Sequence, residues 1–118
     1  MEFFIKKNSE QPILMMEIVQ DGRTQNYTNI QKKLVNSTIR FSMKRESDGL
    51  QKIFMNNAYI TDKTLNNPDL PKEYYIFYKW TSRDTNTEGR FIGEFSITTE
   101  DGELIAPINE TLFINIVN

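Results

Sequence analysis

Hydrophobic and polar residues alternate along much of this chain, and that alternation is the pattern of half-buried β-strands. The segments 37–45 and 90–98 place apolar residues at every second position with polar residues between them, and 111–117 carries a third apolar row. Residues 74–80 instead carry aromatic residues on both faces, which predicts a central strand covered on most of both sides. A second two-sided apolar run covers 13–19.

Turn signals separate these runs and agree with them. Asp-Gly dipeptides occur at 21–22, 48–49 and 101–102, and we expect type I′ hairpin turns there, with positive φ at both central residues. Residues 62–72 are predicted to form the longest loop, whereas 24–36 stay open between a loop and a short helical turn. The expected strands are 2–7, 12–20, 37–45, 50–55, 57–61, 73–80, 90–98 and 111–117, with a weaker one at 103–106.

Together these elements predict an all-β protein, a two-sheet antiparallel β-sandwich of seven to nine strands. The chain of 118 residues has room for one domain and not for two, so we expect residues 1–118 to form a single β-sandwich domain. Its 38% hydrophobic and 25% charged residues are typical of a folded chain rather than a disordered one.

The composition excludes several kinds of chemistry. The chain has no cysteine and no histidine, which excludes disulfides, thiolate nucleophiles, Cys/His zinc sites and imidazole acid–base catalysis. Its formal charge of −2 gives no basic footprint for nucleic acid. Residues 1–7 place apolar residues before lysines, the reverse of a signal peptide, and no apolar run is long enough to span a membrane. We therefore expect synthesis in a cytoplasm and no nucleic-acid or membrane partner.

The best metal candidate is the segment 84–89, where oxygen-bearing side chains alternate before a glycine, as in the first half of a calcium loop. The closing bidentate glutamate should fall at Phe95, an inward strand residue, while Glu94 is one position off and should face solvent. Because the loop lacks this closing ligand, we predict no metal. Since the chain also lacks histidine, cysteine and any catalytic spacing, we predict no cofactor, no catalytic residues and a protein that is not an enzyme. The acids weighed as glycosidase pairs, which fit no motif, are Glu17, Asp84, Glu94, Glu100, Asp101 and Glu103.

Five residues are candidates for contact with a partner. Met15 and Met16 belong to a run of four apolar residues that, unless wholly buried, leaves a strand for a partner to cover. Tyr74 and Tyr75 are adjacent, so one of them points away from any one face, and Trp80 could lie at the rim of the sandwich. The alternative interpretation, which we favour for the aromatic residues, is that their rings fill the core and cover its ends.

The order of several short motifs along nearly the whole chain resembles the N-terminal domain of tailed-phage baseplate upper proteins and related phage structural domains. Each motif is short, so the likeness rests on their order and spacing. The residues that carry it are Phe4-Ile5-Lys6, Pro12-Ile13-Leu14, the Asp21-Gly22 turn, the strand Thr38 to Met43, Tyr78-Lys79-Trp80, Asp84-Thr85, the strand Gly89 to Phe95, the Asp101-Gly102 turn, Pro107 and Phe113 to Ile116.

This resemblance implies an immunoglobulin-like β-sandwich that acts as an attachment module and carries no catalytic residues. We therefore expect a structural protein of the virion that joins tail, baseplate or fibre subunits through protein–protein contacts in a symmetric assembly, with homo-oligomerisation left open. Two alternatives remain: capsid decoration or head-fibre attachment, and a carbohydrate-binding module that uses exposed aromatic rings such as Trp80 or Tyr74.

Overall fold

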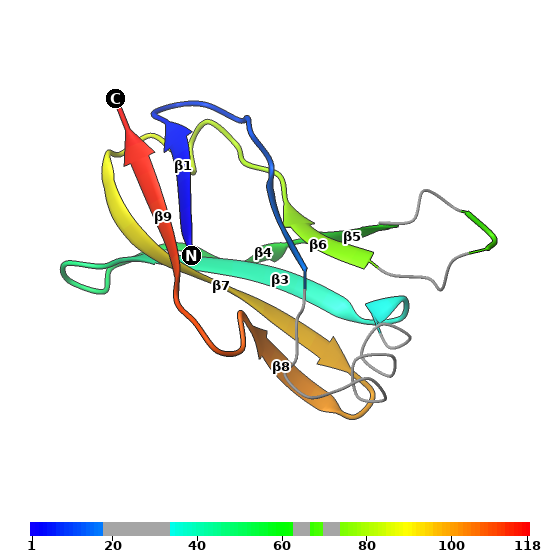
Figure 1. Ribbon diagram of the computed structural model, residues 1–118. Helices are drawn as coiled ribbons and strands as arrows, with labels where there is room; N and C mark the ends of the chain where they lie inside the picture. The colour runs from blue at the N-terminus through cyan, green and yellow to red at the C-terminus, as the bar shows by residue number, and fades with distance from the viewer. Residues whose placement is uncertain (18–33, 63–66, 70–73) are drawn as a thin grey trace.

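The computed structural model describes residues 1–17, 34–62, 67–69 and 74–118, which form β-strands in two sheets (Figure 1). The expectation of an all-β, two-sheet sandwich is confirmed. The strands are β1 (Glu2–Lys6), β2 (Leu14–Glu17), β3 (Thr38–Arg45), β4 (Gln51–Asn57), β5 (Tyr59–Asp62), β6 (Tyr74–Tyr78), β7 (Gly89–Thr99), β8 (Gly102–Ala106) and β9 (Leu112–Val117). Some predictions fall partly outside the described residues: positions 18–20 of the expected strand 12–20, positions 24–33 of the open segment 24–36, and positions 63–66 and 70–72 of the predicted loop 62–72.

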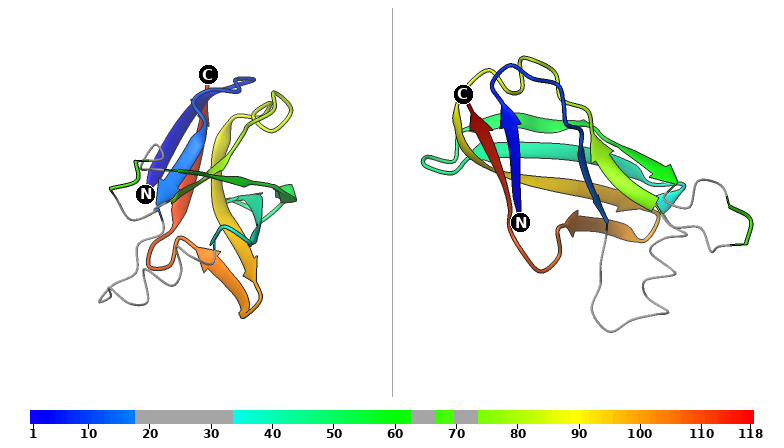
Figure 2. Two further views of the ribbon diagram at one scale, coloured as in Figure 1. Left: turned by 90° about the vertical axis from the view of Figure 1, so that its right-hand side faces the viewer. Right: turned by 45° about the horizontal axis from the view of Figure 1, so that its top comes forward.

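The larger sheet has the strand order β1-β9-β7-β3-β4, and β8 also pairs with β7. The long strand β7 carries β9 along its first half and β8 along its second half (Figure 2). The smaller sheet has the order β2-β6-β5, so the aromatic strand β6 is central, as predicted. One pairing departs from the antiparallel expectation, because β1 runs parallel to β9.

The two described Asp-Gly dipeptides do form hairpin turns, but the type I′ prediction is wrong. Only the glycines have positive φ, 74° at Gly49 and 129° at Gly102. The Asp48 carboxylate accepts a hydrogen bond from the backbone N–H of Leu50 at 3.0 Å, an Asx turn that leaves the left-handed conformation to the glycine. In the second hairpin Gly102 already pairs with Thr99, so the dipeptide is shifted by one position from the centre of the turn. The dipeptide at 21–22 lies outside the described residues.

The core is organised around the ring of Phe41 on β3, which is fully buried. Its centroid lies 4.7 Å from that of Tyr78, 5.0 Å from that of Phe95 and 5.7 Å from that of Trp80. Because Tyr78 belongs to the smaller sheet and Phe95 to the larger one, Phe41 joins the two layers. Aromatic pairs at these separations add to the free energy of burial.

Gly93 on β7 makes room for that ring. A Cβ atom at Gly93 would lie 3.0 Å from both Cε1 and Cζ of Phe41 and 3.4 Å from Cγ1 of Ile114. The edge of the Phe41 ring therefore fills the space that a side chain at position 93 would need. Any larger residue at position 93 would compete with the ring for that space.

The chain passes from one sheet to the other at the junction of β4 and β5. Ala58, the residue between them, still donates its N–H to the carbonyl of Ile39 on β3 at 2.8 Å, and β5 then pairs with β6. Just before this junction the register of β4 against β3 shifts, and Met55 adopts φ 54°, which is rare for a residue with a side chain. The Ser42 hydroxyl accepts the N–H of Met55 at 2.9 Å and fixes this bulge.

Candidate functional site

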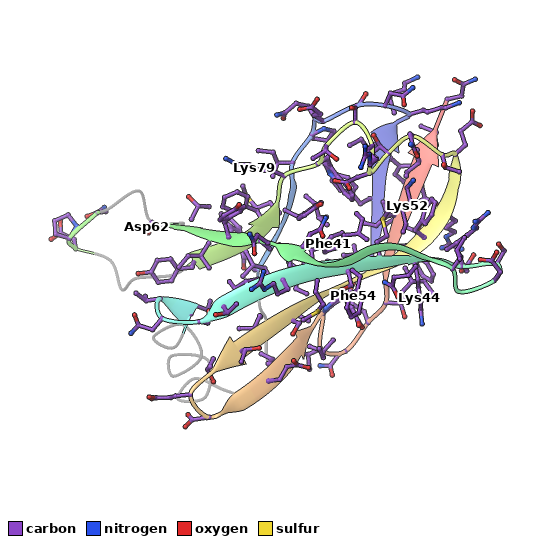
Figure 3. The ribbon with its side chains drawn as sticks, turned by 180° about the vertical axis from the view of Figure 1, so that it is seen from behind. Phe41, Lys44, Lys52, Phe54, Asp62 and Lys79 are labelled. Atoms are coloured by element: carbon purple, nitrogen blue, oxygen red, sulfur yellow. The ribbon has the colours of Figure 1, made fainter. Side chains whose placement is uncertain are left out.

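Strand β4 forms one edge of the larger sheet and exposes apolar side chains. Within the part of the chain that the structure describes, the large sheet ends at β4, which pairs on one side with β3. Phe54 is 71% exposed, and Leu50 and Met55 also reach solvent. In Figure 3, Phe54 and Lys44 lie on one side of the large sheet, opposite to the core residue Phe41. An exposed edge with apolar side chains is a surface to which another strand can add.

The opposite edge of the sheet, β1, is protected differently. Phe4 there is 60% exposed, but it stands between the charged residues Glu2 and Lys6. Glu2 accepts hydrogen bonds from Asn115 at 2.9 Å and from Arg90 at 2.7 Å, and these contacts lower the pKa of its carboxyl. Charged residues on an edge strand disfavour addition of another strand. Since β1 has two of them among five residues and β4 has one, Lys52, among seven, β4 is the more receptive of the two edges.

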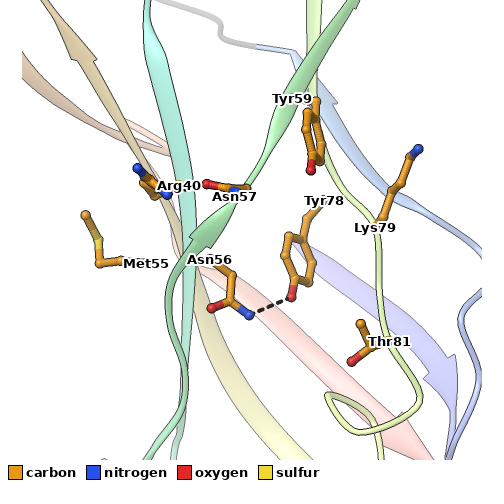
Figure 4. Close-up of a pocket in the computed structure, with 8 residues that line it drawn as sticks. All are labelled: Arg40, Met55, Asn56, Asn57, Tyr59, Tyr78, Lys79 and Thr81. Atoms are coloured by element: carbon orange, nitrogen blue, oxygen red, sulfur yellow. Dashed lines mark hydrogen bonds between the residues drawn. The ribbon is translucent and has the colours of Figure 1, made fainter.

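A polar cleft of about 460 Å³ lies where β4 passes into β5 (Figure 4). Its floor is a chain of hydrogen bonds. The Asn56 amide donates to the Tyr78 hydroxyl at 3.1 Å, and that hydroxyl donates to Asp84 Oδ2 at 2.8 Å. The same carboxylate oxygen accepts the backbone N–H of Thr81 at 2.9 Å. Burial, followed by the contact with Asp84, raises the pKa of Tyr78, so its hydroxyl is a neutral donor at physiological pH.

Two cations stand among the residues that line the cleft. Arg40 on β3 donates a hydrogen bond to Asn57 Oδ1, and Lys79, just after β6, places Nζ 5.8 Å from the centroid of the Tyr59 ring. Tyr59 is 48% exposed, and its ring packs against Phe77 with centroids 5.6 Å apart. No acidic side chain is among the described residues that line the cleft. The electrostatic potential of this lining therefore favours an anionic group.

The segment considered as a calcium loop has a different use. The Asp84 carboxylate is buried and holds the Tyr78 and Thr81 contacts, and Thr85 is fully buried. The Thr85 hydroxyl donates to the carbonyl of Ser9 at 2.8 Å, and its carbonyl accepts the N–H of Asn8 at 2.9 Å. These bonds tie the loop between β6 and β7 to the segment after β1. The strand period places Phe95 in the core and Glu94 in solvent, as predicted.

The five predicted contact residues do not form one surface. Met16 is buried, and Trp80 is only 3% exposed, so Trp80 does not occupy the rim position that the sequence left open. Trp80 continues the buried row of Ile76 and Tyr78 beyond the end of β6, and its indole stacks on Phe3 at 5.8 Å between centroids. The core interpretation is therefore confirmed for Trp80. The other three residues, by contrast, reach solvent in full or in part, and they are Met15, Tyr74 and Tyr75.

Sequence reasoning missed the residues at the β4–β5 junction. One signal was available: Ile53, Phe54 and Met55 are three consecutive apolar residues, and alternation can direct only every second one inward. Nothing comparable marks Arg40 or Lys79, because they line one cleft from segments that are far apart in the sequence.

A scan against protein-family models gives no match to this chain, and a search of curated proteins finds none with significant similarity. The resemblance to phage baseplate domains therefore stays a prediction. No helix within the described residues is long and apolar enough to cross a membrane. Among those same residues, no three acidic side chains come together in an arrangement that could hold a metal ion.

Proposed function

We propose that this chain is a non-enzymatic structural component of a tailed-phage virion, an attachment module that joins subunits of the tail, baseplate or fibre apparatus. The observation that carries the proposal is the β4 edge with Phe54 exposed upon it. The order of motifs along the sequence supports the assignment to the virion, and the two-sheet sandwich fits an attachment role.

The contact is strand addition to β4. The partner supplies an extended segment whose backbone pairs with β4 and whose apolar side chains cover Phe54 and Leu50. Lys52 is the only charged residue within β4, and Lys44 on the neighbouring strand lies on the same side of the sheet as Phe54. A partner segment with acidic residues between its apolar ones is therefore the complementary one.

The virion role is tested by mass spectrometry of density-purified particles, with the copy number of this chain measured against the major capsid protein. A few to tens of copies per particle support the tail, baseplate or fibre role. Hundreds of copies would move the protein to the head, as a decoration or head-fibre attachment protein. Absence from purified particles would overturn the virion proposal.

The edge is tested by a matched pair of substitutions, Phe54→Glu and Phe4→Glu. Both phenylalanines are exposed and lie on opposite edges of one sheet, so each substitution should change the free energy of unfolding by no more than about 0.5 kcal/mol. Phe54→Glu should reduce incorporation into particles, because it removes apolar contact and places a negative charge where an acidic partner segment lies. Equal incorporation of both variants, or a loss confined to Phe4→Glu, would contradict the assignment to β4.

A further inference from the structure

The cleft at the β4–β5 junction lies beyond Phe54 along β4 and has a different character from the edge. Its lining consists of amide and hydroxyl groups around one exposed aromatic ring, with two cations. We propose that this cleft binds an acidic sugar unit, a hexuronic acid or another carboxylate-bearing monosaccharide of a surface glycan. The cleft takes Met55, Asn56 and Asn57 from β4, so a partner strand that pairs along the whole of β4 would cover part of it. The two proposals are tested separately, because the cleft is tested on the isolated chain and the edge contact in particles.

The aromatic ring carries the first part of the argument. Sugar rings present a face of C–H bonds that packs against the face of an aromatic side chain, and Tyr59 offers such a ring in the lining of the cleft. Phe77 packs against the Tyr59 ring and Lys79 Nζ lies over it at 5.8 Å from the centroid, so these contacts restrict the orientation of the ring, and a sugar packs on the part of it that they leave exposed. A ring restricted in advance loses little conformational freedom on binding, which favours affinity.

The polar groups carry the second part. Asn56 uses its amide Nδ2 toward Tyr78, and its carbonyl oxygen points away from that hydroxyl (Figure 4). Asn57, Tyr59 and Thr81 add further amide and hydroxyl groups around the same cleft. Sugar hydroxyls both donate and accept hydrogen bonds, and a mixed lining of this kind meets both needs. A volume of about 460 Å³ is within the range of small-molecule sites.

The two cations of the cleft, Arg40 and Lys79, favour a sugar that carries a carboxylate. Arg40 gives one of its guanidinium donors to Asn57, and a guanidinium has five, so others are available for a carboxylate. Lys79 supplies a second positive charge from the other side of the cleft, while the buried Asp84 carboxylate is engaged by Tyr78 and Thr81. A neutral sugar would leave both cations without a counter-charge. The arrangement therefore discriminates for a carboxylate rather than for sugars in general.

The test is a titration of the full chain with oligogalacturonate, followed by isothermal calorimetry and by the NMR signals of the Asn56 and Asn57 side-chain amides. Maltooligosaccharide of the same length serves as the neutral sugar and polyglutamate as an acidic chain without sugar rings. We expect binding of oligogalacturonate alone, with shifts of both amide signals. Binding of polyglutamate as tightly as of the saccharide would overturn the sugar assignment, and silence of the amides at about 10 mM probe would overturn the site.

Variants separate the ring from the charge. Arg40→Gln and Lys79→Gln should each weaken oligogalacturonate binding by about tenfold, whereas Lys44→Gln, an exposed cation on the same strand as Arg40, should not. Tyr59→Phe keeps the ring and should retain binding, and Tyr59→Leu should lose it. Thermal unfolding of each variant checks that the fold persists. Equal weakening by Lys44→Gln would mean non-specific attraction and would overturn the proposal.

Discussion

The packing of Gly93 against Phe41 allows a quantitative test of the core. Substitution Gly93→Ala places a methyl group 3.0 Å from two atoms of the Phe41 ring, closer than packed carbon atoms approach. Overpacking of this kind costs about 1–3 kcal/mol. Replacing glycine by alanine within a strand recovers about 0.5–1 kcal/mol of backbone entropy. The net expectation is a loss of up to about 2.5 kcal/mol, with a central value of about 1 kcal/mol, and for a chain of this length each kcal/mol lowers Tm by about 4 °C.

A double-mutant cycle identifies the cause. Leucine lacks the Cε1 and Cζ atoms that the new methyl group would meet, so Phe41→Leu opens the space that Gly93→Ala fills. The single substitution Phe41→Leu should cost about 1–2 kcal/mol through lost ring contacts. The double variant should be more stable than the sum of the two single effects predicts, by about 1 kcal/mol. Urea unfolding followed by the fluorescence of Trp80, the single tryptophan of the chain, measures all four proteins.

Gly49→Ala is the matched control for this cycle. Gly49 has φ 74° with nothing within 4 Å of a Cβ at that position, so alanine there meets conformational strain and no clash. It should cost about 1 kcal/mol and show no coupling to Phe41→Leu. The reasoning is refuted if Gly93→Ala is as stable as the parent protein, or if its cost adds to that of Phe41→Leu without coupling.

Three further predictions follow from the polar contacts. Asp84→Ala leaves the Tyr78 hydroxyl and the Thr81 N–H without their acceptor and should cost about 2–3 kcal/mol in urea unfolding, with Asp84→Asn falling between. Burial raises the pKa of Tyr78 in the folded protein above its ordinary value of 10.0. The free energy that the neutral hydroxyl contributes to folding is therefore fully present below about pH 10 and is lost as the pH rises further. In a titration followed by tyrosinate absorbance, one tyrosine should ionise at a higher pH than the others. The folded pKa of Glu2 is lowered, first by the hydrogen bond from Asn115, so stability should decline as pH falls below 4.5, and Glu2→Gln should flatten that decline in thermal scans.

The strands were predictable because their signal is local. Alternation between neighbouring residues places β3, β7 and β9 nearly to the residue, and the weak apolar run before Pro107 is a strand, β8. The turn dipeptides likewise mark the hairpins that follow β3 and β7. The conformation of those turns was not predictable in the same way, because the Asp48 side chain bonds the backbone and changes which residue takes positive φ.

The candidate sites depend on information that alternation does not contain. Alternation places Trp80 on the buried face with Ile76 and Tyr78, but the rings that cover it, Phe3 and Phe41, come from distant parts of the chain. The cleft arises because β4 and β5 belong to different sheets although a single residue separates them. The bulge at Met55 is stabilised by the hydrogen bond from its N–H to the Ser42 hydroxyl, and no pattern in the sequence predicts that contact.

The parallel pairing of β1 with β9 has a mechanical consequence. Five residue pairs join these strands, and bonds from Phe113 to Met1 and from Lys7 to Val117 extend the ladder at each end. The two termini therefore lie at opposite ends of the pair (Figure 1), about 16 Å apart along the strands. Tension applied between the termini pulls β1 and β9 past each other along their length and loads the whole ladder in shear. Rupture then requires many hydrogen bonds to break together, whereas an antiparallel pair with its ends side by side would open one bond at a time.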